Sequence, residues 1–91
     1  MIQVKNGELM NFEFSDKAVK TINRLDVTTK QRIKTAILKL PDGNVRYVKG
    51  KKVTTYRLRI GDWRVVYCFL DRETIFIEKI ATRGKVYKKG A

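Results

Sequence analysis

Arginines alternate with apolar residues over residues 56–67, on both sides of a Gly-Asp pair at 61–62. Folded as a hairpin with that pair as a two-residue loop, the segment places Arg59 opposite Arg64, and Arg57 two residues further along the same face. Like charges placed opposite each other destabilise a sheet. The pattern therefore predicts a site for an anion such as phosphate. The alternative is that these arginines only fill the solvent-facing side of a half-buried sheet.

The apolar residues of the same segment occupy the alternate positions. They are Tyr56, Leu58, Ile60, Val65 and Tyr67. Since successive side chains of a strand point to opposite faces, these residues predict one buried face and leave the arginines on the other. Trp63, beside the turn, can serve as a platform for a base or as a lid on the core, and the pattern favours the lid.

Helices ahead of the hairpin must hold it in place. A strand is predicted over residues 11–14, and Ser15 is predicted to cap a first helix that ends near Leu25. Thr28 predicts the start of a second helix, through a capping box with the residue three positions on. That helix is expected to run to the Pro-Asp-Gly stop at 41–43.

A basic segment rich in Gly and Lys, at residues 44–52, leads into three predicted strands at about 53–60, 63–70 and 74–82. The order strand, helix, helix, strand, strand, strand (β-α-α-β-β-β) predicts an α+β fold, with the helical pair packed on one face of a small antiparallel β-sheet. The chain, residues 1–91, is predicted to form a single domain because its length suits one modest core.

A second tight turn at Asp71-Arg72 extends the register to the last strand. Counting across this turn sets Arg64 opposite Lys79, so that Arg59, Arg64 and Lys79 form a row across three strands. Arg83 flanks the row on the same face. Because the register depends on both turns having two residues, a bulge would displace Lys79 first.

The chain is strongly basic, with 21 Lys and Arg against 9 Asp and Glu and a formal net charge of +12 in 91 residues. Such a field attracts polyanions. Apolar runs are too short for a bilayer span, and no apolar helix carries a basic polar face, so nucleic acid is a better partner than a membrane. The N-terminal residues show no export signal, which predicts a cytoplasmic protein.

The residue types narrow the chemistry further. There is no histidine, which excludes zinc-hydrolase signatures, Ser-His triads and the pair of imidazoles that many ribonucleases use. The single cysteine, Cys68, lies in an apolar strand and has no spacing partner for a disulfide or a metal. We therefore expect no metal and no cofactor. Any catalysis must use Lys, Arg, Tyr or a carboxylate.

Three segments form a recognisable set: Tyr56-Arg57-Leu58-Arg59, Gly61-Asp62-Trp63-Arg64-Val65-Val66-Tyr67, and Thr82-Arg83-Gly84-Lys85-Val86-Tyr87. Together they resemble the RelE/ParE superfamily of bacterial toxins from toxin-antitoxin systems, in particular its RelE-like branch. The likeness covers most of the chain. It implies a type II toxin that enters the ribosomal A site and cuts messenger RNA, as an mRNA interferase. It also implies a cognate antitoxin, and the excess positive charge suits an acidic, partly disordered partner.

Carried over by position, the catalytic residues of the family fall on Arg57, Arg59, Arg64, Arg83 and Tyr87. RelE-type nucleases have lysines at the first two positions, and one of these is thought to be the base that activates the ribose 2′-hydroxyl. A guanidinium is effectively never deprotonated, so Arg59 is predicted to clamp a charged transition state instead. Cleavage through the 2′-hydroxyl needs no metal and gains most from in-line placement and surrounding cations.

Four lysines are predicted to bind RNA around these residues: Lys51, Lys52, Lys79 and Lys85. Three of them, Lys51, Lys52 and Lys85, are also candidates for a replacement base, because crowding by cations lowers the pKa of a lysine. Tyr87 can stack on a splayed base or donate its hydroxyl. Its alternative role is that of a tail aromatic that covers the sheet edge.

Two other functions are compatible with the sequence. The ParE-like branch of the superfamily shares the fold, lacks the ribonuclease residues and inhibits DNA gyrase by binding. A nucleic-acid-binding module without activity would show steep salt dependence of binding and no toxicity. The gathering of cations on one sheet face, together with Tyr87, favours the nuclease.

Overall fold

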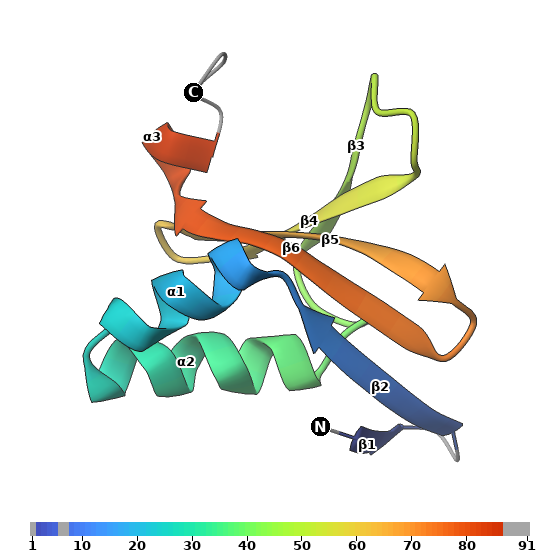
Figure 1. Ribbon diagram of the computed structural model, residues 1–91, viewed down its shortest axis with the longest axis horizontal. Coiled ribbons are helices and arrows are strands. Elements are labelled where there is room, and N and C mark those ends of the chain that lie inside the picture. Colours follow the sequence, from blue (N-terminus) through green and yellow to red (C-terminus); the bar gives the residue numbers. More distant parts are fainter. Residues whose placement is uncertain (1, 6–7, 87–91) are drawn as a thin grey trace.

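The computed structural model describes residues 2–5 and 8–86, and these form one six-stranded sheet with two helices packed on one face (Figure 1). In chain order the elements are β1 (Ile2–Lys5), β2 (Glu8–Phe14), α1 (Asp16–Arg24), α2 (Val27–Leu38), β3 (Val45–Val48), β4 (Thr55–Ile60), β5 (Trp63–Asp71), β6 (Thr74–Thr82) and α3 (Arg83–Val86). The strands lie in the order β1-β2-β6-β5-β4-β3. The predicted α+β fold, with the helical pair on a single face, is confirmed.

The face of the sheet beneath the helices is apolar and makes the core. Its buried side chains include Ala18, Ile33 and Ile37 from the helices, and Phe12, Leu58, Val65, Tyr67, Ile75, Ile77 and Ile80 from the sheet. Tyr56, Ile60 and Trp63 pack against this cluster. The apolar half of the alternating segment therefore faces the core, as predicted, and Trp63 closes the core at its edge.

Side-chain caps fix where the two helices begin. The Ser15 hydroxyl oxygen accepts a hydrogen bond from the backbone N–H of Ala18 at 3.0 Å, so the predicted cap of α1 is confirmed. The second cap is Asp26 rather than Thr28, because a carboxylate oxygen of Asp26 accepts from the N–H of Thr29 at 3.1 Å. The helix thus starts one residue before the predicted cap, and the charged acceptor also suits the positive end of the helix.

Strand pairing departs from the prediction at β2. This strand runs parallel to β6, whereas the other neighbouring strands of the sheet run antiparallel. A parallel pair needs a long crossover, and the chain between β2 and β6 supplies one through the helical pair and three strands. The segment predicted as a basic loop also contains the edge strand β3, which pairs with β4.

The hairpin of β4 and β5 has the predicted register. Arg59 lies opposite Arg64, and the Gly-Asp pair forms the turn, with Gly61 in the left-handed region at φ 59°. Glycine is favoured there because it has no side chain to clash with the following carbonyl.

The predicted pairing of Arg64 with Lys79 is wrong. Arg64 lies opposite Ala81, and Lys79 lies opposite Val66. The turn that precedes β6 begins one residue later than predicted, because a carboxylate oxygen of Asp71 accepts from the N–H of Glu73 at 2.8 Å. The two irregularities in the β5–β6 pairing offset each other, so the later turn alone moves the partner of Arg64 from Lys79 to Ala81, and Lys79 stays on the arginine face but in a different row.

Candidate RNA-binding site: an arginine pocket

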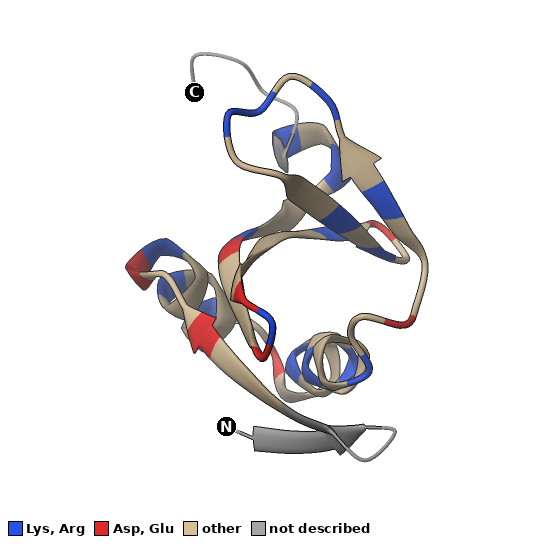
Figure 2. Cartoon of the chain, turned by 90° about the vertical axis from the view of Figure 1, so that its right-hand side faces the viewer, with Lys and Arg blue, Asp and Glu red and all other residues tan. Residues whose placement is uncertain are grey.

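Five arginines line one cavity of about 330 Å³ on the sheet face opposite the helices. They are Arg46 of β3, Arg57 and Arg59 of β4, Arg64 of β5 and Arg83 at the start of α3, and Asn44 completes the lining. We call this cavity the arginine pocket. Figure 2 shows basic bands on the strands in the upper half of the molecule, above the helical pair.

Cross-strand pairing brings these arginines together. Arg46 lies opposite Arg57, and Arg59 lies opposite Arg64, so two like-charged pairs stand next to each other on the same face. The backbone N–H of Arg83 donates to the carbonyl of Asp62 at 2.7 Å, which anchors the start of α3 to the β4–β5 turn. The fifth guanidinium is thereby held beside the other four.

Arg64 is the most enclosed of the five, with 6% of its surface exposed. Its Nη1 nitrogen donates to the carbonyl oxygens of Gly61 at 2.7 Å and Trp63 at 2.9 Å. Burial lowers the pKa of the Arg64 guanidinium, and the nearby charges of Arg59, Arg57 and Arg83 lower this pKa further. Arginine nevertheless stays protonated in proteins, so the pocket holds a partly desolvated cation that an incoming anion would stabilise.

No carboxylate lines the arginine pocket among the residues that the structure describes. Guanidinium groups offer planar, paired donors that match the oxygens of a phosphate. The arrangement can therefore bind a phosphodiester and stabilise extra negative charge on it. None of its lining groups can act as a general base at neutral pH, since guanidinium does not deprotonate and a carboxamide is not basic.

Within residues 2–5 and 8–86, no group of three or more His, Cys, Asp or Glu side chains is placed to hold a metal ion. Nor is any described helix long and apolar enough to cross a membrane.

Residues 12–87 match the family model described as "ParE toxin of type II toxin-antitoxin system, parDE". The match covers most of the chain. The chain belongs to this family of toxins. The membership of the RelE/ParE superfamily that the sequence predicts is thereby confirmed.

Solved structures of RelE-type toxins share the fold of this ParE-family toxin. The archaeal RelE–RelB complex from Pyrococcus horikoshii OT3 aligns with a TM-score of 0.65 and 24% identity over 84% of this chain and 97% of that chain. The RelB–RelE complex from Methanococcus jannaschii aligns with a TM-score of 0.67 and 22% identity over 87% of this chain and 99% of that chain. YafQ from Escherichia coli aligns with a TM-score of 0.59 and 16% identity, also over 87% of this chain and 99% of that chain. No curated protein sequence matches the toxin.

Four of the residues predicted from the toxin's sequence as catalytic lie together in the arginine pocket: Arg57, Arg59, Arg64 and Arg83. The fifth, Tyr87, lies outside the described residues. The sequence prediction does not include two pocket residues, Asn44 and Arg46, because it assigns the segment that carries them to a loop. The signal was present in the sequence, since Val45, Arg46, Tyr47 and Val48 are residue types typical of an edge strand.

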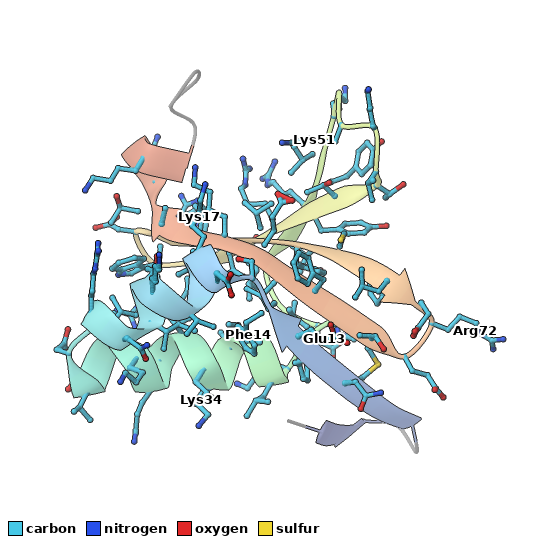
Figure 3. The ribbon with its side chains drawn as sticks, in the orientation of Figure 1. Glu13, Phe14, Lys17, Lys34, Lys51 and Arg72 are labelled. Carbon is cyan, nitrogen blue, oxygen red and sulfur yellow. The ribbon has the colours of Figure 1, made fainter. Side chains whose placement is uncertain are left out.

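The predicted RNA-binding lysines lie outside the arginine pocket. Lys51 and Lys52 are exposed in the β3–β4 connection, where Figure 3 shows Lys51 near the tip. Lys79 and Lys85 line a different cavity, which residues of α1 and β6 also line. The structure therefore divides the predicted site into one compact arginine cluster and surrounding lysines.

Proposed function

We propose that this toxin is a ribosome-dependent endoribonuclease that cuts messenger RNA through the ribose 2′-hydroxyl group. The observation that supports it best is the arginine pocket, in which five guanidinium groups line a cavity without a described carboxylate. A phosphodiester is the anion that this geometry suits, because its oxygens accept paired hydrogen bonds from guanidinium. The RelE and YafQ structures that share the fold are consistent with the proposal.

In the proposed reaction the 2′-oxygen bonds to the adjacent phosphorus while the bond from phosphorus to the 5′-oxygen breaks. The products are a 2′,3′-cyclic phosphate and a 5′-hydroxyl end. Arg59, Arg64 and Arg83 stabilise the charge that builds up on the phosphoryl oxygens. Since the guanidinium groups stay protonated, the 2′-hydroxyl proton passes to water, and the leaving oxygen takes its proton from water.

The lack of a base in the pocket explains why the reaction would depend on the ribosome. Loss of general acid-base assistance typically costs about a hundredfold to ten-thousandfold in rate. Holding the scissile bond in line recovers a comparable factor, because it removes the entropic cost of orientation. A messenger RNA held in the A site is such a prearranged substrate. Free RNA is then cut far more slowly.

The proposal includes a cognate antitoxin. The relatives from P. horikoshii and M. jannaschii are complexes of RelE with RelB. A net charge of +12 favours an acidic partner. An apolar groove of about 230 Å³ between α1 and α2, with Val19 and Ile22 on one wall and Lys30 and Lys34 at its rim, suits a chain that carries both apolar and acidic side chains. Such a partner would co-purify with the toxin and suppress its growth arrest.

The test is to map RNA 5′ ends after induced expression of the toxin and of a variant that carries Arg59→Gln and Arg83→Gln. Both side chains are exposed, so the variant should fold. We expect cuts at A-site codons for the unchanged toxin and none for the variant. The matched control is Arg72→Gln, in the β5–β6 turn (Figure 3), which removes one exposed arginine and should leave cleavage intact. Unchanged cleavage in the double variant would remove the arginine pocket from the mechanism.

Inhibition of DNA gyrase is the second candidate, because the family model that matches is that of ParE. The arginines in place of the lysines expected at a RelE-type site also favour a toxin that acts by binding. A supercoiling assay with purified gyrase separates the two functions. Inhibition of supercoiling without any new RNA ends would establish the ParE-like activity and refute the nuclease.

A further inference from the structure

A second cationic cavity lies beside the arginine pocket, between α1, the last part of β6 and α3. Its volume is about 440 Å³. Its lining includes Lys17, Arg24, Trp63, Lys79, Ile80 and Lys85. Four of these residues are cations, and none of the described lining residues is acidic. We call this cavity the tryptophan cavity.

The tryptophan cavity differs from the arginine pocket because much of its wall is apolar. Trp63 and Ile80 belong to the core side of the sheet, and Leu25 follows the end of α1. Trp63 is only half-buried, so it closes the core and also presents part of its ring to the cavity. The lysines stand around this wall, and in Figure 3 Lys17 rises from α1 past β6 towards the side where α3 lies. An aromatic wall within a basic cavity is the combination that binds single-stranded nucleic acid.

The two cavities adjoin each other. Ala81 of the tryptophan cavity lies opposite Arg64, and Lys79 lies opposite Val66, which in turn lies opposite Arg57. Two strand spacings separate the backbones of Lys79 and Arg57 by about 10 Å, and the two side chains lie on the same face of the sheet. The short helix α3 contributes to both cavities, because Arg83 lines the arginine pocket and Lys85 lines the tryptophan cavity. A single strand that places one phosphate among the arginines can therefore extend into the second cavity.

We propose that the tryptophan cavity binds a nucleotide of the RNA next to the one whose phosphate enters the arginine pocket. The base packs on the exposed part of Trp63, and the phosphate lies between Lys79 and Lys17 or Lys85. The inference rests on the proposed nuclease function for the statement that the bound strand is messenger RNA. Binding of a strand in the tryptophan cavity does not require that the strand is cut. An acidic peptide is the competing occupant, and the continuity with the arginine pocket favours the RNA.

The chain contains a single tryptophan, so tryptophan fluorescence reports on this cavity directly. The experiment titrates a short single-stranded RNA into the purified toxin and follows Trp63 emission. Stacking of a base should quench the emission in a saturable way, whereas inorganic phosphate should not. Lys79→Gln and Lys17→Gln should each weaken binding about fivefold at low salt. Each should also reduce the slope of log affinity against log salt by about 0.7, the value for one phosphate contact on a single strand.

The matched control is Arg72→Gln, because Arg72 is an exposed cation in the β5–β6 turn (Figure 3) that lines neither cavity. It should leave the salt slope and the quenching unchanged. The proposal is overturned if RNA binds without quenching Trp63, or if both cavity variants behave like the control. An acidic peptide that shifts the emission to shorter wavelength, and that depends on Lys79 when RNA does not, would assign the cavity to a protein partner.

The outcome is separable from that of the proposed function. If the toxin cuts no RNA but Trp63 is quenched with the expected dependence on Lys79 and Lys17, the tryptophan cavity is an RNA site and the nuclease proposal fails. If messenger RNA is cut while quenching is absent and Lys79→Gln leaves cleavage unchanged, the nuclease stands and the cavity proposal fails.

Discussion

The directly opposed pair of Arg59 and Arg64 predicts that removing one charge stabilises the fold while it damages the site. The perturbation is Arg59→Gln, which keeps most of the side-chain stem and removes the cation. Arg59 is exposed, whereas Arg64 is buried and fixed to the turn by two hydrogen bonds. Removal of the exposed partner therefore relieves repulsion without leaving buried donors unpaired.

Like charges at directly opposed positions of a sheet cost a fraction of a kcal/mol. For a domain of this size that relief corresponds to a rise of about 3 °C in Tm. The gain should depend on salt, because the screening length falls from about 10 Å at 0.1 M to about 3 Å at 1 M. Binding of single-stranded RNA should weaken. The slope of log affinity against log salt should fall by about 0.7, because one phosphate contact is lost.

Thermal unfolding followed by circular dichroism, at low and at high salt, measures the gain in stability. Arg72→Gln is the control, since this exposed arginine lies in the turn between β5 and β6, away from the pocket. The reasoning is refuted if Arg59→Gln lowers Tm at low salt. It is equally refuted if the gain in Tm persists unchanged at high salt, because the stabilisation would then not be electrostatic.

Three further predictions concern the fold. Ser15→Ala should cost about 1–2 kcal/mol in urea unfolding, because the Ser15 hydroxyl both caps α1 and donates to a carbonyl of β6 at 2.6 Å. Burial raises the pKa of Tyr67 from 10.0 to about 12. As pH rises, the unfolded chain therefore loses the Tyr67 proton before the folded chain does. About 3 kcal/mol of stability should disappear between pH 10 and pH 12. Unfolding experiments across this range should show that Tyr67→Phe abolishes the loss. Gly43→Ala should cost about 1–3 kcal/mol, because Gly43 has φ 121° and an added Cβ would lie 3.0 Å from a methyl of buried Leu58. Gly50→Ala is the comparison that isolates the contact, because Gly50 also has a positive φ, 82°, but has open space around it.

The hairpin could be predicted from the sequence because its signals are local. A period of two residues determines which side chains share a face, and a Gly-Asp pair between two such runs specifies a two-residue turn. These signals predicted that Arg57, Arg59 and Arg64 share a face and that Leu58 and Val65 are buried. Helix periodicity likewise predicted the helical pair, although the acceptor that caps α2 is Asp26 and not Thr28.

The parts that could not be predicted depend on long-range pairing. β3 is a short edge strand whose residues become ordered by pairing with β4, so Arg46 joins the pocket only once that pairing exists. The position of Lys79 depends on the turn after β5, which begins one residue later than predicted because Asp71 accepts from the N–H of Glu73. The parallel contact of β2 with β6 joins segments about 60 residues apart.

One face of the sheet packs in the core and stabilises the fold, whereas the other face carries the cations of the proposed binding site. Arg64 contributes to both stability and binding. The helices cover the apolar face, so changes at Leu58 or Val65 act on the core. The opposite face carries cations that contribute repulsion to the folded state and attraction to an anion. Arg64 has both roles, because its guanidinium donates hydrogen bonds to the carbonyl groups of Gly61 and Trp63 at the β4–β5 turn and also lines the pocket. A phosphodiester would therefore do more than occupy the pocket: by neutralising opposed charges on β4 and β5, it would stabilise the turn that positions them.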